Sequence, residues 1–278
     1  MEGRVRATIG SFVADNPANR LYGGSVAYFD PPLVGFAGLD DPLFTDYKEI
    51  IGDFHLTPRE LLAANFDDEP AAGTVISWIL PVSETIRQSN RHETEFPSRE
   101  WTHARFHGES LNGLLRRHLV DWLTDQGYRA LAPQFAQQLR ELPETPKGRA
   151  STWSERHAAY AAGLGTFSLN DGLITAKGIA HRCGSVVTDL VLPPTPRASQ
   201  GYADNCLYLR EGSCGACVGR CPVGAISFAG HDKERCCAYV YGAVPAAVAE
   251  KFGVKATGCG LCQTRVPCES GIPRSTRR

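Results

Sequence analysis

Hydrophobic positions recur along the chain at two different periods. Between residues 101 and 125 the leucines fall at steps of three and four, and Gly127 follows, so this stretch predicts an amphipathic helix that ends before the glycine. Residues 74–80 form an apolar, β-branched run that Pro81 closes, which is typical of a buried strand. The two periods together predict a core built from both helices and strands.

The rest of the chain gives shorter signals. Thr57, Pro58 and Glu60 have the order of an N-cap, a first helical residue and a capping-box partner, and predict a helix start. Residues 1–56 are weakly periodic and rich in Gly, Pro and Asp, so we expect an irregular wrap with short helices. The other expected elements are strands at 129–132, 173–176 and 184–192, helices near 134–141 and at 152–162, and a stiff linker at Pro193, Pro194 and Pro196. Since no regular βαβ period appears, the predicted fold class is α+β.

Composition narrows the class of protein. Hydrophobic residues make up 42% of the 278 residues and charged residues 21%, which indicates a globular chain. The formal net charge is −1, so we do not expect nucleic acid as a partner held by overall charge. The N-terminus lacks the apolar stretch of a secretion signal, and no run is long enough to span a membrane. We therefore expect a protein of the reducing cytoplasm without membrane contact.

The ten cysteines all lie between residues 183 and 268. In a reducing compartment this concentration favours metal binding over disulfides. One motif has the spacing C-x2-C-x3-C-P and consists of Cys214, Cys217, Cys221 and Pro222. These are the last three cysteines of a bacterial ferredoxin run, but Glu211 occupies the usual first position and the nearest upstream cysteine is Cys206.

A second group follows, with a closing interval two residues longer than usual. It consists of Cys236, Cys237, Cys259, Cys262 and Cys268. In two-cluster ferredoxins the fourth cysteine of each run binds the other cluster. Applied here, one [4Fe–4S] cluster takes Cys206, Cys214, Cys217 and Cys268. The other takes Cys221, Cys259, Cys262 and either Cys236 or Cys237, with Cys236 preferred.

Other metal contents are compatible with part of this pattern. The C-x2-C pairs suit adjacent corners of an iron–sulfur cube, because Gly215 and Gly260 permit the tight turns. Two such pairs are also the pattern of one zinc site of four thiolates, which leaves Cys206, Cys221, Cys236 and Cys268 without a role. A single cluster is the third reading.

The segment before the cysteines carries a family resemblance. Residues 155–192 include an Ala-Gly-Leu-Gly segment at 162–165 and a Thr-Asp-Leu strand end at 188–190, and they run directly into the ferredoxin motif. This order resembles the epoxyqueuosine reductases and the corrinoid-dependent reductive dehalogenases. Arg235-Cys236 followed by Cys259-x2-Cys262-Gln263 is also similar to the second half of the epoxyqueuosine reductase ferredoxin.

The resemblance implies a nitroreductase-like core at residues 1–198 and a two-cluster ferredoxin domain at 199–278. It also implies an oxidoreductase in which electrons from an external ferredoxin or flavodoxin pass through two [4Fe–4S] clusters to cobalamin, where a small organic substrate is reduced. The chain departs from the epoxyqueuosine reductases at one point. They carry a catalytic aspartate shortly before the Ala-Gly-Leu-Gly helix, whereas no aspartate lies between Asp125 and Asp171 here, so we expect a relative with another substrate.

Several residues near these motifs are candidates for the site. Arg91, in a basic stretch after the predicted strand, suits an anionic group, and His157 and Tyr160 are candidate proton donors. The candidates for cofactor contact are Gly163, Gly165, Arg182, Thr188 and Asp189. Packing explains the aromatic residues equally well, a helix cap explains Gly163, and strand-end hydrogen bonding explains Thr188 and Asp189. A Thr152-x-x-Glu155 capping box would make Glu155 structural.

Two rival functions remain from sequence. An electron-transfer protein without its own substrate would need far fewer residues than the cysteine-free stretch 1–182 supplies. A flavin-dependent reductase with FMN on the same core is the other alternative. No G-x-G-x-x-G fingerprint is present, so a separate electron donor is expected in each case.

Overall fold

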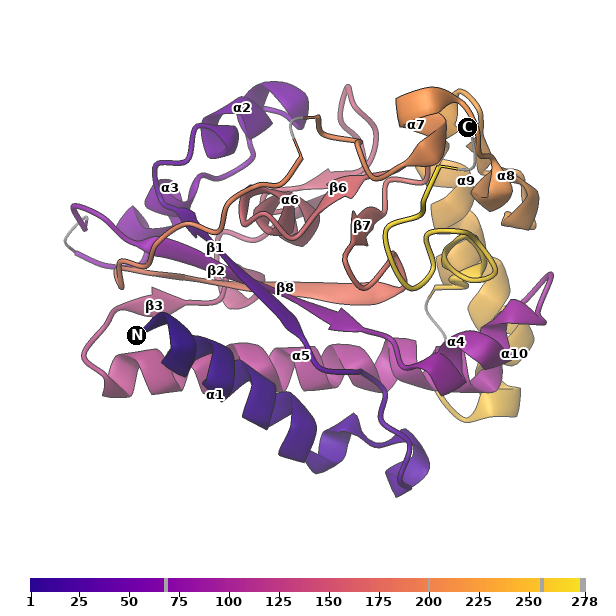
Figure 1. Cartoon of the computed structure of the whole chain (residues 1–278), viewed down its shortest axis with the longest axis horizontal. Helices are drawn as coiled ribbons and strands as arrows, with labels where there is room; N and C mark the ends of the chain where they lie inside the picture. Colours follow the sequence, from indigo (N-terminus) through magenta and orange to yellow (C-terminus); the bar gives the residue numbers. More distant parts are fainter. Residues whose placement is uncertain (68–69, 200, 256–257, 276–278) are drawn as a thin grey trace.

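The computed structural model describes residues 1–67, 70–199, 201–255 and 258–275. Its centre is an antiparallel sheet of four strands in the order β1-β2-β8-β3 (Figure 1). The strands are β1 (Leu33–Gly38), β2 (Thr74–Pro81), β8 (His181–Thr188) and β3 (Ala130–Leu131). The two central strands pair along all eight of their residues, so β8 is held in place from both sides.

One face of the sheet carries the longest helix. Ile76, Trp78 and Leu80 share a core with residues of α1 (Glu2–Asp15) and α5 (Arg99–Asp125), and both helices run along the sheet below it in Figure 1. These three side chains alternate along β2 and therefore point to the same face. Packing against α5 fixes one long helical face beside the start of β8.

The opposite face is covered by shorter helices. Val75 packs with residues of α2 (Leu43–Ile50), α3 (Pro58–Ala63) and α6 (Glu155–Ala161). Ile79, four residues after Val75 and therefore on the same face of β2, packs with Ala159 of α6. Helices and strands are therefore mixed around one sheet, with a layer of helices on each face (Figure 1).

Smaller elements complete the molecule. Three two-stranded hairpins are β4 (Glu141–Leu142) with β5 (Ala150–Ser151), β6 (Gly165–Phe167) with β7 (Leu173–Thr175), and β9 (Ile226–Ser227) with β10 (Gly230–His231). The other helices are α4 (Glu84–Arg91), α7 (Leu207–Glu211), α8 (Ala216–Arg220), α9 (Lys233–Ala238) and α10 (Val244–Phe252). The helices from α7 onward gather at one end of the sheet, at the right of Figure 1. Among the described residues, none of the helices has the length and apolar content to cross a membrane.

The cysteine-rich end is tied to the sheet by hydrogen bonds and ion pairs. The Ile179 amide donates to the Cys268 carbonyl over 2.9 Å. Arg220 donates to the carbonyl oxygens of Glu93 and Asn90, next to α4. The segment just before β8 and the last cysteine loop therefore lie next to each other.

The proline-rich segment after β8 is not a free linker. The Thr195 amide donates to the Phe36 carbonyl over 2.9 Å, and the Phe36 amide donates to Thr195 Oγ1 over 3.0 Å. Residues 193–196 therefore lie along the outer edge of β1.

Several sequence predictions are confirmed. The strand expected at 74–80 is β2, and the long helix is α5, with Gly127 at a φ of +86° just after its end. The capping box of Thr57 and Glu60 opens α3 as expected.

Other predictions are wrong. Residues 134–141 hold a short 3-10 turn and the start of β4 in place of a helix, and residues 1–56 contain the 14-residue α1 and the strand β1. The helix expected from 152 starts at Glu155 with Ser154 as its cap. The Thr152 hydroxyl instead donates to the Gln138 carbonyl. The last strand begins three residues earlier than expected and ends at Thr188.

Candidate functional site

One set of cysteines surrounds a small cavity of about 30 Å³. The cysteines on its wall are Cys206, Cys214, Cys217 and Cys268, which the sequence groups together. Apolar side chains, among them Ile179 and Val266, complete the wall. Burial, followed by the charges of Cys217, Cys206 and Cys214, raises the pKa of Cys268 to about 12. The four sulfurs lie near enough to oppose one another's ionisation.

A second set lies against the first. Burial raises the pKa of Cys262 well above its usual value, and the charges of Cys259, Cys236 and Cys221 add to this effect. Burial and the neighbouring Cys259 and Cys221 also raise the pKa of Cys236 to about 11. The Ala225 amide donates to the Cys221 sulfur over 3.2 Å, a contact typical of cluster ligands. Cys236 therefore has the neighbours that a fourth member of this set needs.

The donor chemistry of the two sets suits clusters of several irons. All ten cysteines are free thiols. Within the described ranges, no three or more His, Cys, Asp or Glu side chains converge as ligands of a single metal ion. Corner thiolates of a cube bind different irons and stand farther apart than the ligands of one ion. Thiols that resist ionisation together become good ligands when a cationic group binds among them.

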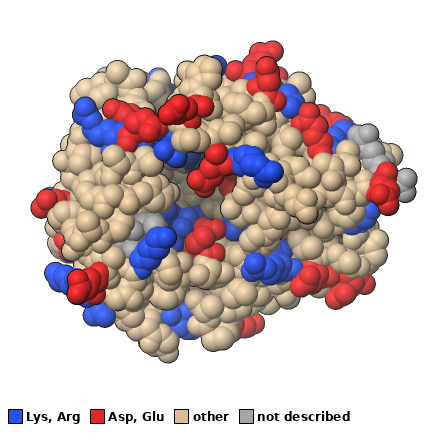
Figure 2. Space-filling model, turned by 180° about the vertical axis from the view of Figure 1, so that it is seen from behind, with Lys and Arg blue, Asp and Glu red and all other residues tan. Residues whose placement is uncertain are grey.

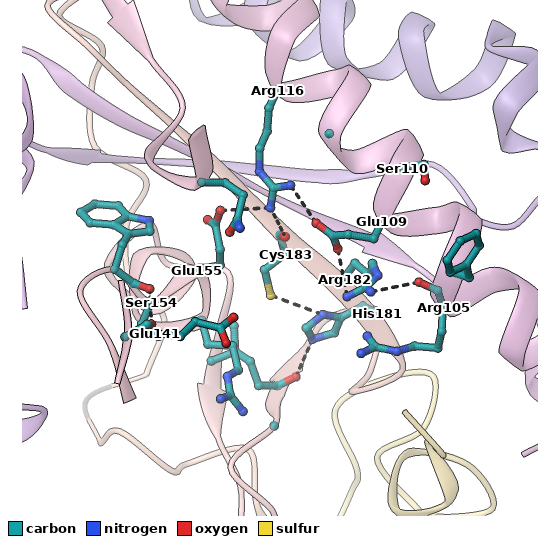
Figure 3. Close-up of a pocket in the computed structure, with 18 of the residues that line it drawn as sticks. Arg105, Glu109, Ser110, Arg116, Glu141, Ser154, Glu155, His181, Arg182 and Cys183 are labelled. Carbon is teal, nitrogen blue, oxygen red and sulfur yellow. Dashed lines mark hydrogen bonds and ion pairs between the residues drawn. The ribbon is translucent and has the colours of Figure 1, made fainter. Parts of the chain in front are cut away.

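A much larger cavity, of about 1150 Å³, lies beside the start of β8. Its walls come from α5, from the β4–β5 hairpin, from the start of α6 and from the cysteine-rich end of the chain. The close-up shows the side chains of α5 and β8 directed toward one another across it (Figure 3). It is the largest of the described cavities and the best candidate for a ligand site.

Helix α5 presents a polar stripe toward this region. Arg105, Glu109, Asn112 and Arg116 follow one another at steps of four, three and four, which places them on one helix face. Asn112 accepts a hydrogen bond from the Trp78 indole and donates to the Cys183 carbonyl, both over 2.9 Å. The stripe is therefore anchored to both central strands.

Arg116 is the centre of an ion-pair network although its side chain is only 2% exposed. It contacts Glu109 at 2.9 Å and Glu155 at 3.1 Å. Although burial opposes it, these two carboxylates hold the pKa of Arg116 above its usual value. Arg182 contacts Glu109 at 3.1 Å, and Ser185 donates to Glu155 over 2.5 Å. The network joins α5, α6 and β8 at the cavity (Figure 3).

A histidine and a cysteine face the cavity from the start of β8. His181 Nε2 lies 2.8 Å from the Leu173 carbonyl, which can only accept, so this nitrogen carries the proton. Nδ1 is then an acceptor, and the Cys183 sulfur lies 3.6 Å from it. Burial lowers the pKa of His181 to about 4 and raises the pKa of Cys183 to about 12. Both groups are therefore neutral at pH 7, with a thiol that donates to an imidazole.

The cavity reaches the second cysteine set. Gln263, adjacent to Cys262, lines it, as does Tyr241. A Cβ added at Gly258 would lie 2.7 Å from Arg105 Nε, so the turn before Cys259 touches the cavity wall. The set of Cys221, Cys236, Cys259 and Cys262 is therefore next to the cavity.

Arg182 is the one cofactor candidate from sequence that lines this cavity. Tyr160, Gly163 and Gly165 line a separate one of about 160 Å³. The φ of Gly163 is +72°, as a helix end requires, and a Cβ at Gly165 would lie 2.4 Å from the Ile174 carbonyl. At both positions other backbone segments pack too closely to leave room for a side chain.

The other sequence candidates lie outside the large cavity. The His157 ring packs against Tyr47 and Phe167 at 4.7 and 4.6 Å between ring centres, and burial lowers its pKa to about 3. Arg91 binds Glu269 at 2.6 Å, beside Cys268. These contacts join parts of the protein and leave neither residue on the wall of the cavity.

Thr188 and Asp189 are at the far end of β8. The Thr188 hydroxyl donates to the Arg129 carbonyl over 2.8 Å, and Asp189 pairs with Arg129 at 2.8 Å. Strand-end hydrogen bonding, the alternative reading from sequence, describes both contacts.

Sequence reasoning missed Arg116, Glu109, His181 and Cys183. The four-three-four spacing of the polar stripe was the available signal for the helix residues. For His181 and Cys183 it was their alternation at the start of an apolar strand.

Comparison with known proteins gives partial similarity. No protein-family model matches the chain. An epoxyqueuosine reductase from Bacillus anthracis is 32% identical over 124 residues, which is 43% of this chain and 30% of that protein. One from Francisella cf. novicida is 30% identical over 45% of this chain and 34% of its own length. The similarity thus spans about a third of these relatives.

Solved structures extend the similarity to the fold. An epoxyqueuosine reductase crystallised with an epoxyqueuosine-modified tRNA-Tyr stem loop is similar over 99% of this chain and 67% of its own, with TM-score 0.53 and 17% identity. A catabolic reductive dehalogenase is similar over 72% of this chain and 26% of its own, with TM-score 0.47 and 17% identity. The sequence matches support the resemblance to epoxyqueuosine reductases, and the match at TM-score 0.53 shows that the chain shares the fold of that solved epoxyqueuosine reductase.

Proposed function

We propose that this protein is an iron–sulfur reductase that brings low-potential electrons to a ligand in the large cavity and reduces a small organic substrate there. The observation that carries the proposal is the adjacency of two sets of four cysteines and one large charged cavity. The similarity to epoxyqueuosine reductases supports an oxidoreductase. We further propose the division into a nitroreductase-like part, residues 1–198, and a two-cluster ferredoxin part, residues 199–278.

The two cysteine sets would hold one [4Fe–4S] cluster each. The set of Cys221, Cys236, Cys259 and Cys262 borders the cavity through Gln263 and Arg105, so its cluster is the one next to the substrate. The set of Cys206, Cys214, Cys217 and Cys268 is the entry point for a ferredoxin or flavodoxin donor. The protein would hold the two clusters close to each other and to the cavity.

Cobalamin is the cofactor proposed for the cavity. The volume of about 1150 Å³ exceeds that of ordinary ligand pockets, as a corrinoid requires. When bound, a corrinoid supplies a cobalt centre that reacts with organic substrates at low potential. Arg182 and the polar stripe of α5 would hold it from two sides. FMN is the alternative for the same cavity.

The proton for the reduction would come from the cavity wall. Cys183 holds a proton there at neutral pH, and His181 orients it through the fixed imidazole. We therefore move the role of proton donor from Tyr160 and His157, which lie elsewhere, to Cys183. A neutral thiol would replace the aspartate that is absent between Asp125 and Asp171.

Two classes of substrate are candidates for the cavity. The near-zero net charge favours a small molecule. Against the expectation that nucleic acid is no partner, one structural neighbour holds a tRNA stem loop, so we retain a modified tRNA loop as the second candidate.

The test begins with the cofactors. Protein reconstituted anaerobically with iron and sulfide should bind about eight irons per chain and absorb broadly near 400 nm. Cys236→Ser should lower the iron content, while the matched Cys237→Ser should not. Titration with cobalamin and with FMN then identifies the cavity ligand. A colourless protein with one zinc would reject the proposal, and reducible clusters without either cofactor would favour an electron carrier.

Turnover completes the test. Reduced methyl viologen would drive the loaded protein with a brominated phenol or an epoxyqueuosine-modified tRNA stem loop as substrate. Cys183→Ala should lower turnover by about a hundredfold with iron content unchanged. Tyr160→Phe should leave the rate near that of the wild type.

A further inference from the structure

The last cysteine loop contains a buried carboxylate, that of Glu269. In the space-filling view, basic and acidic side chains lie next to one another at the surface, where water screens their charge (Figure 2). The Glu269 side chain is only 6% exposed, and it directly follows Cys268 in the sequence. A buried charge is costly unless other groups bind it. The partners of Glu269 therefore show what holds a charge at this position.

The carboxylate closes the loop that carries Cys268. The Arg265 amide donates to Glu269 Oε2 over 2.6 Å, and the Glu269 amide donates to the Val266 carbonyl over 3.0 Å. Arg265 has a φ of +58°, in the left-handed region that residues other than glycine seldom adopt. The loop lies between Cys262 and Cys268, the interval that is two residues longer than in the usual ferredoxin run. The longer interval is thus folded into a compact turn that leads to Cys268.

Two arginines of α4 hold the same carboxylate. Arg91 donates from Nε to both oxygens, at 2.9 and 3.0 Å, and its terminal nitrogen lies 2.6 Å from Oε1. Arg87, whose side chain is only 8% exposed, lies 3.4 Å away. These arginines also pair with Glu84 and Asp30, whose side chains are exposed to water. The Cys268 loop is therefore fastened to α4 by charge-assisted hydrogen bonds.

The same loop forms part of the first cysteine set, which consists of Cys206, Cys214, Cys217 and Cys268. Val266 and Cys268 both line the cavity of about 30 Å³ that this set surrounds. The Ile179 amide donates to the Cys268 carbonyl over 2.9 Å, and Ile179 lines the same cavity. Consecutive α-carbons are about 3.8 Å apart, so the charge of Glu269 lies close to this set. The ion pair of Arg91 and Glu269 thus joins α4 to the last member of the set.

We propose that Arg91 and Glu269 position Cys268 as a ligand of the first cluster and set the reduction potential of that cluster through their charges. Reduction adds an electron, so a nearby negative charge lowers the potential and a nearby positive charge raises it. In the intact pair the two charges offset each other. This role rests on the proposed function, since it requires a cluster in the first set. It makes Arg91 a positioning residue in place of the site role expected from sequence.

Redox titration of the anaerobically reconstituted protein, followed by electron paramagnetic resonance, measures the potential of each cluster. Glu269→Gln keeps an oxygen for the Arg265 amide but removes the negative charge, so the potential of the first cluster should rise. Arg91→Met removes the positive charge, so the same potential should fall. At a fixed potential each variant should change the ratio of reduced to oxidised cluster about tenfold, which is about 59 mV for a one-electron couple.

Matched variants separate charge from structure. Damaged packing gives no reason for shifts of opposite sign, and the double variant Arg91→Met/Glu269→Gln should return the potential to near that of the wild type. Arg91→Lys keeps the charge and should do the same. Asp189→Asn removes a carboxylate from the ion pair at the other end of β8 and should leave both potentials unchanged. Cys214→Ser identifies the signal of the first cluster, because Cys214 belongs to that set.

The position of Cys268 has its own measurement, the rate at which an iron chelator removes the first cluster. Glu269→Ala removes the acceptor for the Arg265 amide as well as the charge. It should therefore lose this cluster about tenfold faster than Glu269→Gln does. Loss of the first cluster in Arg91→Met but not in Arg91→Lys would support the same role. Equal rates in Glu269→Ala and Glu269→Gln would overturn it.

The outcomes distinguish this role from the proposed function. Two reducible clusters with the same potentials in the wild type, Glu269→Gln and Arg91→Met would overturn the charge role and leave the proposed function intact. Shifts of the same sign in the two variants would overturn it as well. A wild type that binds no iron would reject the proposed function together with this role.

Discussion

The two ends of β8 use the same kinds of residue in different ways. At its start, Arg182 and Glu109 belong to a buried network around a large cavity. At its end, Arg129 and Asp189 form a single ion pair, which is more exposed and lies where β3 joins the sheet. Both places are polar strand ends, and the large cavity formed by the described residues borders the first of them. The difference between the two ends comes from α5 and the cysteine-rich end, which lie across from the start of β8 and form other walls of the cavity.

The largest expected difference concerns Cys183. Burial raises its pKa to about 12, and only the thiolate reacts with iodoacetamide, so at pH 7 alkylation should be about a thousandfold slower than for a free thiol. The rate should rise about tenfold per pH unit up to that pKa. Mass spectrometry of the Cys183 peptide measures it, with the urea-unfolded chain as control. Equal rates in the two states would contradict a protonated thiol.

Next is the buried arginine at the same end. Arg116→Met leaves Glu155 and Glu109 without their central cation, and should lower the free energy of unfolding by about 3 kcal/mol. Arg129→Met, at the exposed end, should cost less than about 1 kcal/mol. Urea titrations of the two variants give both values. Similar losses would mean that the two ends do not differ in stability.

Acid should also affect the start of β8. His181 has a folded pKa of about 4 against about 6.5 when unfolded, so the unfolded chain binds the proton more readily between these values. Stability from the neutral imidazole is complete above pH 6.5 and is lost as the pH falls toward 4. His181→Gln should therefore lose about 2 kcal/mol less than the wild type over this interval. Parallel curves of unfolding free energy against pH would argue against it.

The smallest effect is expected for Asp189→Asn. Its carboxylate pairs with a partly exposed Arg129, so the substitution should cost about 1 kcal/mol or less. Because the residue is not among those that line the cavity, titration with cobalamin or FMN should give the affinity of the wild type. A loss of affinity for the cofactor that the wild type binds would remove the distinction between the two ends.

Local patterns were the predictable part of the molecule. The long helix α5, the strand β2 and the cap of α3 each depend on neighbours in sequence, and all three were predictable. The grouping of cysteines into two cluster sites also depends on local spacing, and it stays a prediction. The helix α1 was missed although Val5, Ile9 and Val13 recur at steps of four, because glycine and charged residues fill the remainder.

The cavity is formed by segments that are far apart in the sequence, so its residues were harder to predict from local patterns. Arg116 on a helix reads as a solvated side chain, and only packing against β8 and α6 buries it. Glu155 reads as a capping residue because Thr152 precedes it by three. In the fold, Thr152 bonds the Gln138 carbonyl, which leaves Glu155 for the ion-pair network. For both Arg116 and Glu155, contacts with distant segments give the side chain a role different from the one that its local sequence predicts.

The segment around Thr195 has a consequence for association between copies of the chain. An edge strand with open amides and carbonyls can template pairing with another molecule. Thr195 occupies the edge of β1 at Phe36, and the neighbouring prolines have no amide with which to continue the ladder. The opposite edge strand, β3, has only two residues. The sheet therefore offers few free edge groups for pairing with another molecule, and a segment that resembles a spacer in sequence covers one of its two edges.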